Sequence, residues 1–547
     1  MATDRAFDRF RNEFFDYFTA EFPTWATWMG IHKYDGKLTK YDEATVKARN
    51  RRVKALLRKV GKFDLRKLTG DDRVDADYVV GHLKFWEMFE RRFPAHRREP
   101  SMYVSDILFG LYVLIERDFA PKDRRARSLL KRMRQVPTRL KEAMANLDNP
   151  PKEFTESAIL EAQGALGFLK TTAREFISTV RGWEFAKLRK DLHAATGRAE
   201  KAFERFIRFL REDLLPRSKG RFAVGKQMFN AALKHQHHVD IDADALLKLG
   251  RKHLREIKRE LAAVARKISR TKSWERIVDE LKQDHPTNAK LVDFYAKEMK
   301  RARDFVRAKK LVTFPKRERL RVIETPDFAK PVIPYAAYLS PAPFEDRKEG
   351  IFWVTKVGKG TPRARAKEQL EGHPKAGIAV TALHEGYPGH HLQLSVASYH
   401  PDKLRHMMHT SVFAEGWALY CEEMMWEQGF YGDWRSRLLQ LKDALWRACR
   451  VIVDVSLHTG KMTFDQAVKF LVKEAKLEEV NAITEVRRYC QTPTQPMSYL
   501  LGKKLMLELL EDYKARAGDK FKLRKFHNEL LAHGTIPVKY VRELMGL

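Results

Sequence analysis

The sequence predicts a mainly α-helical protein that contains one small β-sheet. Apolar residues recur every three or four positions through most of the chain, which is the period of an amphipathic helix. Between residues 311 and 360 this pattern stops, and prolines exclude long helices there. The prolines are Pro315, Pro326, Pro331, Pro334, Pro341 and Pro343. Segments 320–323 and 351–354 are the best strand candidates, so we expect a small sheet at this point.

The N-terminal helices are predicted from their apolar faces. Residues 5–20 place five phenylalanines three or four positions apart: Phe7, Phe10, Phe14, Phe15 and Phe18. Residues 43–60 and 72–93 repeat the helical pattern. Another helix is expected between Pro121 and Asn149, with Pro137 at a kink or break. The pattern recurs over residues 199–215.

A small histidine cluster precedes the next predicted helix. Its members are His235, His237 and His238. Histidine and aspartate are both metal ligands, so a metal is one interpretation. We favour the other interpretation, in which Asp242 is the N-cap of a helix that carries Leu246, Leu247 and Leu249. From residue 367 to the end of the chain the pattern is again helical.

The sequence allows two interpretations of the domain organisation. A boundary before the strand segment separates residues 1–310, an N-terminal helical region, from residues 311–547, which hold the sheet and the candidate site. A single continuous domain is the alternative.

Charge and cysteine content narrow the classes of partner. The formal net charge of +33 makes nucleic acid a possible partner, but only through the basic surface, because lysine and arginine are mixed with acidic residues along the chain. The three cysteines (Cys421, Cys449 and Cys490) form no CxxC pair, which excludes a disulfide scaffold and fits a reducing compartment. The longest apolar run, 107–115, is about half of a membrane helix. We therefore expect a cytoplasmic protein without a membrane partner.

The densest group of metal-binding residue types lies in segment 381–393, which contains His384, Glu385, His390 and His391. A His-Glu pair followed by further histidines is typical of zinc hydrolases. In the common short motif the two histidines are four residues apart, which would place the second at position 388. That position is Pro388, so the second ligand is His390 or His391. A regular helix favours His391, seven residues after the first. Pro388 and the neighbouring glycines permit a bulged turn that would bring His390 to the metal instead, and we favour His390.

The remaining roles follow from the chemistry of zinc. Glu415, twenty-five residues after His390, is the expected third protein ligand of one Zn2+ per chain. Glu385 is the expected general base, which assists the attack of a zinc-bound water. Glu422 lies seven residues after Glu415 and could ligate the metal or orient a histidine. The alternative is that these histidines are ordinary surface residues of one amphipathic helix.

Further residues could stabilise an oxyanion. Tyr489, Tyr499 and Arg488 lie in segment 485–502, and a phenol or guanidinium aimed at the reacting oxygen would serve that purpose. Asp454 and His458 could line the same cavity.

These motifs resemble a bacterial and archaeal family known as domain of unknown function 885, whose members are predicted zinc peptidases. The resemblance covers nearly the whole chain and is strongest in three segments: 384–393, 415–420 and 485–502. The family's similarity to thimet oligopeptidase and carboxypeptidase Taq implies a gluzincin-like (zincin-like) helical body with a deep active-site cleft. It also implies that residues 1–310 form one cleft wall and that two histidines and one glutamate hold zinc at the floor.

The sequence therefore predicts a zinc metallopeptidase that hydrolyses short peptides, of the oligopeptidase or carboxypeptidase type. An exposed edge strand beside the metal helix could hold an extended peptide. Two alternatives stay open. One is a basic helical nucleic-acid-binding protein whose histidine-rich helix is structural, and the other is an inactive zinc-binding relative. The presence of Glu385 argues against the second.

Overall fold

The computed structural model of the protein describes residues 5–68, 70–327, 329–330, 333, 335–358 and 360–547. Pro331 and Pro334, two of the prolines considered above, lie outside the described residues. The chain divides into two compact units. The first comprises Met1–Phe222, Pro326–Val332 and Ala342–Arg347, and the second comprises Ala223–Thr325, Ile333–Pro341 and Lys348–Leu547. Residues 223–310, which we expected in the N-terminal region, therefore fold with the sheet and the candidate site.

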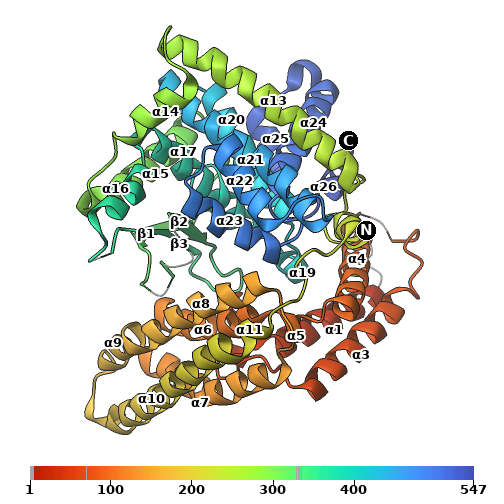
Figure 1. The fold of residues 1–547 in the computed structure, drawn as a ribbon. Helices are drawn as coiled ribbons and strands as arrows, with labels where there is room; N and C mark the ends of the chain where they lie inside the picture. Colours follow the sequence, from red (N-terminus) through yellow and green to blue (C-terminus); the bar gives the residue numbers. More distant parts are fainter. Residues whose placement is uncertain (1–4, 69, 328, 331–332, 334, 359) are drawn as a thin grey trace. The chain divides into compact units, whose positions relative to one another are not determined.

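The first unit consists of helices (Figure 1). They are α1 (Arg5–Glu21), α2 (Pro23–Trp28), η1 (His32–Tyr34), α3 (Glu43–Val60), α4 (Gly70–Arg92), α5 (Ala95–Arg98), α6 (Pro100–Glu116), α7 (Lys122–Asn146), α8 (Lys152–Lys170), α9 (Thr172–Ser178), η2 (Trp183–Phe185), α10 (Ala186–Phe209), η3 (Leu210–Leu214) and α11 (Leu215–Arg217). All five phenylalanines of the predicted first helix are buried in α1. That helix is confirmed.

The helix predicted around Pro137 differs in one respect. It continues through Pro137 as α7 and does not break there. Its apolar face, which includes Leu129, Met133 and Leu140, is fully buried and packs against α6 and α10. Burial of this face outweighs the hydrogen bond that a proline removes from a helix.

The second unit contains the sheet and the remaining helices. These are α12 (Lys226–His235), α13 (Ala243–Ile268), α14 (Trp274–Lys282), η4 (Asn288–Lys290), α15 (Leu291–Ala308), β1 (Arg319–Glu324), β2 (Ala336–Leu339), β3 (Glu349–Val354), α16 (Arg363–Glu371), α17 (Lys375–Glu385), α18 (His390–Ala397), α19 (Lys403–Met407), α20 (Ser411–Glu427), α21 (Trp434–His458), α22 (Phe464–Ala475), α23 (Glu479–Gln491), α24 (Ser498–Ala517), η5 (Gly518–Lys520), α25 (Leu523–Ala532) and α26 (Val538–Leu544).

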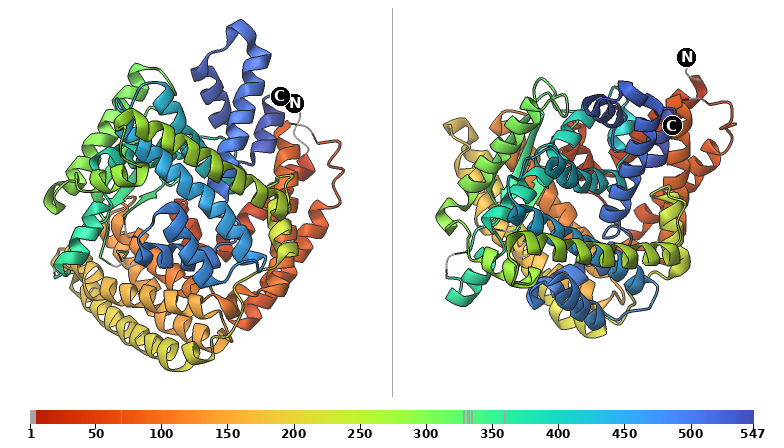
Figure 2. Two further views of the ribbon diagram at one scale, coloured as in Figure 1. Left: turned by 45° about the horizontal axis from the view of Figure 1, so that its top comes forward. Right: turned by 90° about the horizontal axis from the view of Figure 1, so that it is seen from above.

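The helix that follows the histidine cluster begins as predicted. The side chain of Asp242 accepts a hydrogen bond from the backbone N–H of Ala245 and caps α13. His237 is buried and lies between the hydroxyls of Thr410 and Thr494. Figure 2 shows α13 running alongside α21, and this contact explains why residues 243–268 belong to the second unit.

The three strands form a mixed sheet in the order β1-β3-β2. β3 is parallel to β1 and antiparallel to β2, with Phe352 opposite both Val322 and Tyr338. The side chain of Phe352 is fully buried against α15 and α17, in one core with Tyr295 and Ile378. Both predicted strands are confirmed, and the sheet packs on the helix that carries His384. Strand β2 was not predicted.

Two glycines allow α20 and α24 to cross at close range. A Cβ atom on Gly416 would overlap the backbone of Gly502, and a Cβ atom on Gly502 would overlap the carbonyl oxygen of Val412. Neither position therefore accepts a side chain. Because the two helices cross here, Glu415 of α20 and Tyr499 of α24 lie near each other.

No helix among the described residues is both long and apolar enough to cross a membrane.

Candidate metal centre

The His-Glu segment folds as two helices joined by a short turn. α17 ends at Glu385 and α18 begins at His390. Gly389 lies against the end of α17, where its N–H donates to the carbonyl of Leu383 and a Cβ atom would overlap the carbonyl oxygen of His384. Only glycine fits at that close approach. The chain therefore does not form a continuous helix here, and a turn of residues 386–389 takes the place of the expected bulge.

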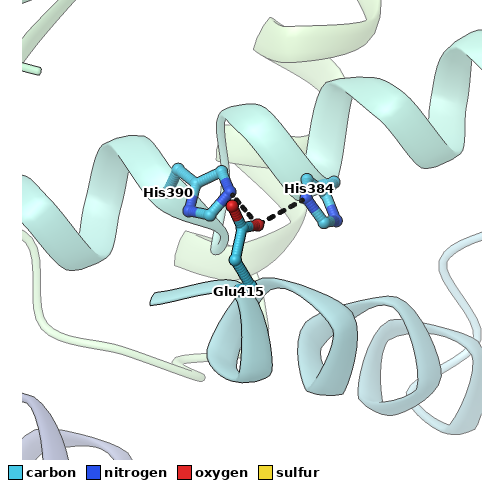
Figure 3. A group of neighbouring side chains, drawn as sticks. All are labelled: His384, His390 and Glu415. Carbon is cyan, nitrogen blue, oxygen red and sulfur yellow. Dashed lines mark hydrogen bonds and ion pairs between the residues drawn. The ribbon is translucent and has the colours of Figure 1, made fainter. Parts of the chain in front are cut away.

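This turn brings His384 and His390 to one point above α20. Figure 3 shows Glu415 of α20 pointing toward both imidazoles. The Nε2 atoms of His390 and His384 lie 3.1 and 3.8 Å from Oε2 of Glu415. Ligands about 2.1 Å from a tetrahedral zinc ion are separated by about 3.4 Å, and these two distances bracket that value.

The donor set therefore fits a zinc ion. One ligand atom from each of the three side chains lies within 4.8 Å of the others. In the part of the chain that the structure describes, no other group of three or more His, Cys, Asp or Glu side chains converges in this way. Zinc prefers nitrogen and carboxylate ligands of this kind.

Glu422 orients the first histidine. Its Oε1 atom lies 2.8 Å from Nδ1 of His384, and the Glu422 side chain is fully buried. This hydrogen bond holds Nδ1 and turns Nε2 toward Glu415, so that Nε2 is the nitrogen that would bind a metal. Burial lowers the pKa of His384, but the carboxylates of Glu415 and Glu422 raise it overall to about 10 in the metal-free protein. The same negative charges favour a divalent cation.

His391 lies in a different cluster. Its Nε2 atom is 2.8 Å from Oε1 of Glu318 and its Nδ1 atom is 3.0 Å from the hydroxyl of Tyr338 on β2. Tyr387 also donates to Glu318, and Arg303 donates to the other carboxylate oxygen at 3.1 Å. Both ring nitrogens of His391 thus have partners other than Glu415. The geometry selects His390 as the second candidate ligand and corrects the alternative assignment to His391.

Glu385 is available for proton transfer. Its side chain is half-buried, next to His384 in sequence, and its negative charge contributes to the raised pKa of that histidine. Its carboxylate makes no hydrogen bond or ion pair with the residues that the structure describes. A carboxylate without such partners can accept a proton from a substrate water within its reach.

The two candidate tyrosines occupy different places. The ring of Tyr499 stacks on His384, with centroids 6.3 Å apart and an interplanar angle of 15°. Burial, with the charge of Glu415, raises the pKa of Tyr499 to about 12, so its hydroxyl is a donor at neutral pH. The hydroxyl of Tyr489 instead accepts a hydrogen bond from Nε of Arg450 at 2.9 Å, in a fully buried position. Tyr489 is therefore a hydrogen-bond partner of the Arg450 guanidinium and does not face the histidines.

Arg488 is linked to the candidate metal centre through the amide of Gln495, a residue that was not predicted. Its Nη1 atom donates to Oε1 of Gln495 at 2.8 Å, and Nε2 of Gln495 lies 3.4 Å from Oε1 of Glu415. Arg450 and Glu318 were not predicted from the sequence either. Arg450 interrupts an otherwise apolar helical run, 448–453, and a charged residue in such a run is a signal for a buried partner.

Asp454 holds the turn that carries Gln495. Its two carboxylate oxygens accept the backbone N–H groups of Thr494 and Met497 at 3.2 and 3.1 Å. Burial raises the pKa of Asp454 to about 8. His458, one helical turn later, bonds to the backbone carbonyl of Tyr489 at 3.0 Å. Asp454 and His458 thus support the backbone of segment 489–497, which carries Gln495, and they do not line the site.

The fold and site define a mainly helical protein with a small mixed sheet, in which one glutamate and two histidines converge between three helices. The chain belongs to the family described as "Bacterial protein of unknown function (DUF885)", whose model matches residues 23–545. No curated protein matches this chain.

Two solved structures are similar over essentially the whole chain. A "putative lipoprotein of unknown function" from Shewanella oneidensis is 27% identical, with a TM-score of 0.79 and full coverage of both chains. A "putative lipoprotein" from Colwellia psychrerythraea is 20% identical, with a TM-score of 0.83, and the match covers 99% of this chain and 98% of that one. The second similarity concerns the fold alone.

Proposed function

We propose that the protein is a zinc-dependent metallopeptidase that hydrolyses short peptides. The observation that carries the proposal is the convergence of His384, His390 and Glu415, with the unengaged carboxylate of Glu385 beside it. Two histidines and one glutamate leave a fourth position of a tetrahedral ion open, as a catalytic zinc site requires. A structural zinc site would use that position as well.

Zinc held there would polarise the peptide carbonyl and lower the pKa of the attacking water. Glu385 takes a proton from that water as the water oxygen adds to the carbonyl carbon. The hydroxyl of Tyr499 donates to the oxyanion that develops on the substrate. The C–N bond then breaks, the proton passes from Glu385 to the leaving amine, and the water oxygen remains in the new carboxylate.

The sheet offers a place for the peptide. β2 is an edge strand, and its Tyr338 bonds to His391, the residue after the candidate ligand His390. An extended peptide added to this edge would run past the metal centre. The deep cleft of a zincin-like fold, which the family resemblance implies, stays a prediction.

The alternatives make different predictions. A nucleic-acid-binding protein would bind through the basic surface, with strong dependence on salt and no need for metal. An inactive zinc-binding relative would keep the ligands, but the unengaged Glu385 has no use in such a protein. The expected cytoplasmic location also stays a prediction, because the similar solved proteins are called lipoproteins and the cell envelope is therefore the alternative.

The test compares Glu385→Gln with the wild type on a mixture of N-acetylated hexapeptides, read by mass spectrometry. We expect zinc-loaded wild-type protein to shorten peptides, and Glu385→Gln to retain its zinc while the rate falls by about a hundredfold or more. Glu427→Gln, an exposed position on α20, is the matched control and should behave as wild type. Unchanged hydrolysis by Glu385→Gln, or no hydrolysis by zinc-loaded wild type, would contradict the proposal.

A further inference from the structure

Two arginines share one carboxylate near the candidate metal centre. Arg450 and Arg488 both donate to the same oxygen, Oε2 of Glu485, at 3.2 and 2.9 Å. One carboxylate thus serves two guanidinium groups. The two arginines and Glu485 together carry one positive charge in excess, in a region where burial strengthens its attraction for an anion.

Arg488 is the member of this group that a ligand can reach. Its side chain is 36% exposed, whereas that of Arg450 is 7% exposed. Of its five N–H groups, two donate to residues that the structure describes, namely Glu485 and Gln495. The planar guanidinium fork matches a carboxylate, to which it can make two parallel hydrogen bonds.

The side chain of Gln495 sets the distance between Arg488 and the metal ligands. Its amide oxygen accepts from Arg488, and its amide nitrogen faces Glu415, which is the orientation that satisfies both neighbours. One amide group therefore separates the guanidinium from the carboxylate ligand. A separation of this size is on the order of two residues of extended peptide, ~7 Å.

We propose that Arg488 binds the C-terminal α-carboxylate of the substrate, so that the protein is a carboxypeptidase that removes one or two residues. This inference rests on the proposed peptidase function. A peptide that continues past this point, or one with an amidated end, would leave the guanidinium charge unpaired, and the site would discriminate against it. The leaving amine is then the amino group of the released amino acid or dipeptide.

The experiment uses two hexapeptide mixtures, both N-acetylated, that differ only in a free or an amidated C-terminus. Cleavage by zinc-loaded protein gives the ratio of acid to amide rates and the masses of the products. Retention of the same mixtures by the Glu385→Gln protein on ultrafiltration gives the ratio for binding without turnover. Both ratios are measured again with Arg488→Gln added, and with Arg487→Gln, which removes the same charge from the adjacent position of α23.

We expect wild type to prefer the free acids by about tenfold or more and to release one or two C-terminal residues. Arg488→Gln should bring both ratios close to one while the zinc content is kept, and Arg487→Gln should leave them high. A purely structural role of Arg488 would lower acid and amide rates together, leave the ratio unchanged and overturn the inference. Equal cleavage of both mixtures by wild type would also overturn it and leave the peptidase proposal standing. Acid-selective retention without any cleavage would reject peptidase function and support the role of Arg488 in binding.

Discussion

Glu422 and Glu415, both on α20, each approach one ring nitrogen of His384. Oε1 of Glu422 lies 2.8 Å from Nδ1, and Oε2 of Glu415 lies 3.8 Å from Nε2. The two glutamates are seven residues apart on α20, so nearly two helical turns place them on the same face. Under the proposed function, Glu415 would share a metal ion with the histidine, while Glu422 holds Nδ1 and so fixes the angle of the ring.

The charge of Glu422 should therefore set the affinity for metal. Glu422→Gln keeps the shape of the side chain but removes the negative charge beside Nδ1 of His384, and we expect zinc affinity to fall by about 10- to 100-fold. Competition with a chromophoric chelator measures this change, and circular dichroism checks that the helices persist. Glu427→Gln, exposed on the same helix, should keep the wild-type affinity. An affinity unchanged in Glu422→Gln would refute the orienting role.

Substitutions of His390 and His391 should have different effects on zinc binding and on stability. His390→Ala removes a ligand, so the protein should lose its bound zinc. His391→Ala breaks hydrogen bonds to Glu318 and Tyr338, so the protein should keep zinc but lose about 1–3 kcal/mol of stability. Zinc content and thermal unfolding distinguish the two variants. Loss of zinc from His391→Ala alone would show that the turn rearranges and that His391 is the ligand.

Asp454 should make stability depend on pH. Burial raises its pKa in the folded protein to about 8, from an ordinary value of 3.8. The folded state therefore holds this proton more tightly, so the contribution of the protonated group is complete below about pH 4 and is lost as the pH rises through 8. In Asp454→Asn this dependence is absent. We therefore expect the Tm of wild type to fall relative to that of the variant between pH 5 and pH 8.5. Both proteins are measured in chelator to exclude effects of metal. A difference that stays constant would show that the carboxyl group is ionised throughout.

The sequence predicts the elements whose signal is local. Phenylalanine spacing defines α1, the apolar segment 351–354 defines β3, and Asp242 caps α13, because each depends on neighbours within a few positions. Pro137 shows the limit of local rules, since burial of the surrounding helix overrides the break that proline favours.

Long-range partners could not be predicted in the same way. The choice between His390 and His391 depends on Glu318, which lies 73 residues from His391 in sequence. The link between Arg488 and the metal centre depends on Gln495, whose environment only the packing of α20, α23 and α24 creates. The residue types of the site were thus recognisable, but the position of each side chain required the tertiary structure.

The most direct test of the metal centre is the zinc content of purified protein, by elemental analysis, for wild type and Glu415→Ala, with Glu427→Ala as the control. The geometry of His384, His390 and Glu415 predicts about one zinc ion per chain in the wild type and in Glu427→Ala, and loss of that zinc from Glu415→Ala. Wild-type protein that neither contains zinc nor takes it up on reconstitution would contradict the account, as would a Glu415→Ala protein that binds zinc as tightly as the wild type.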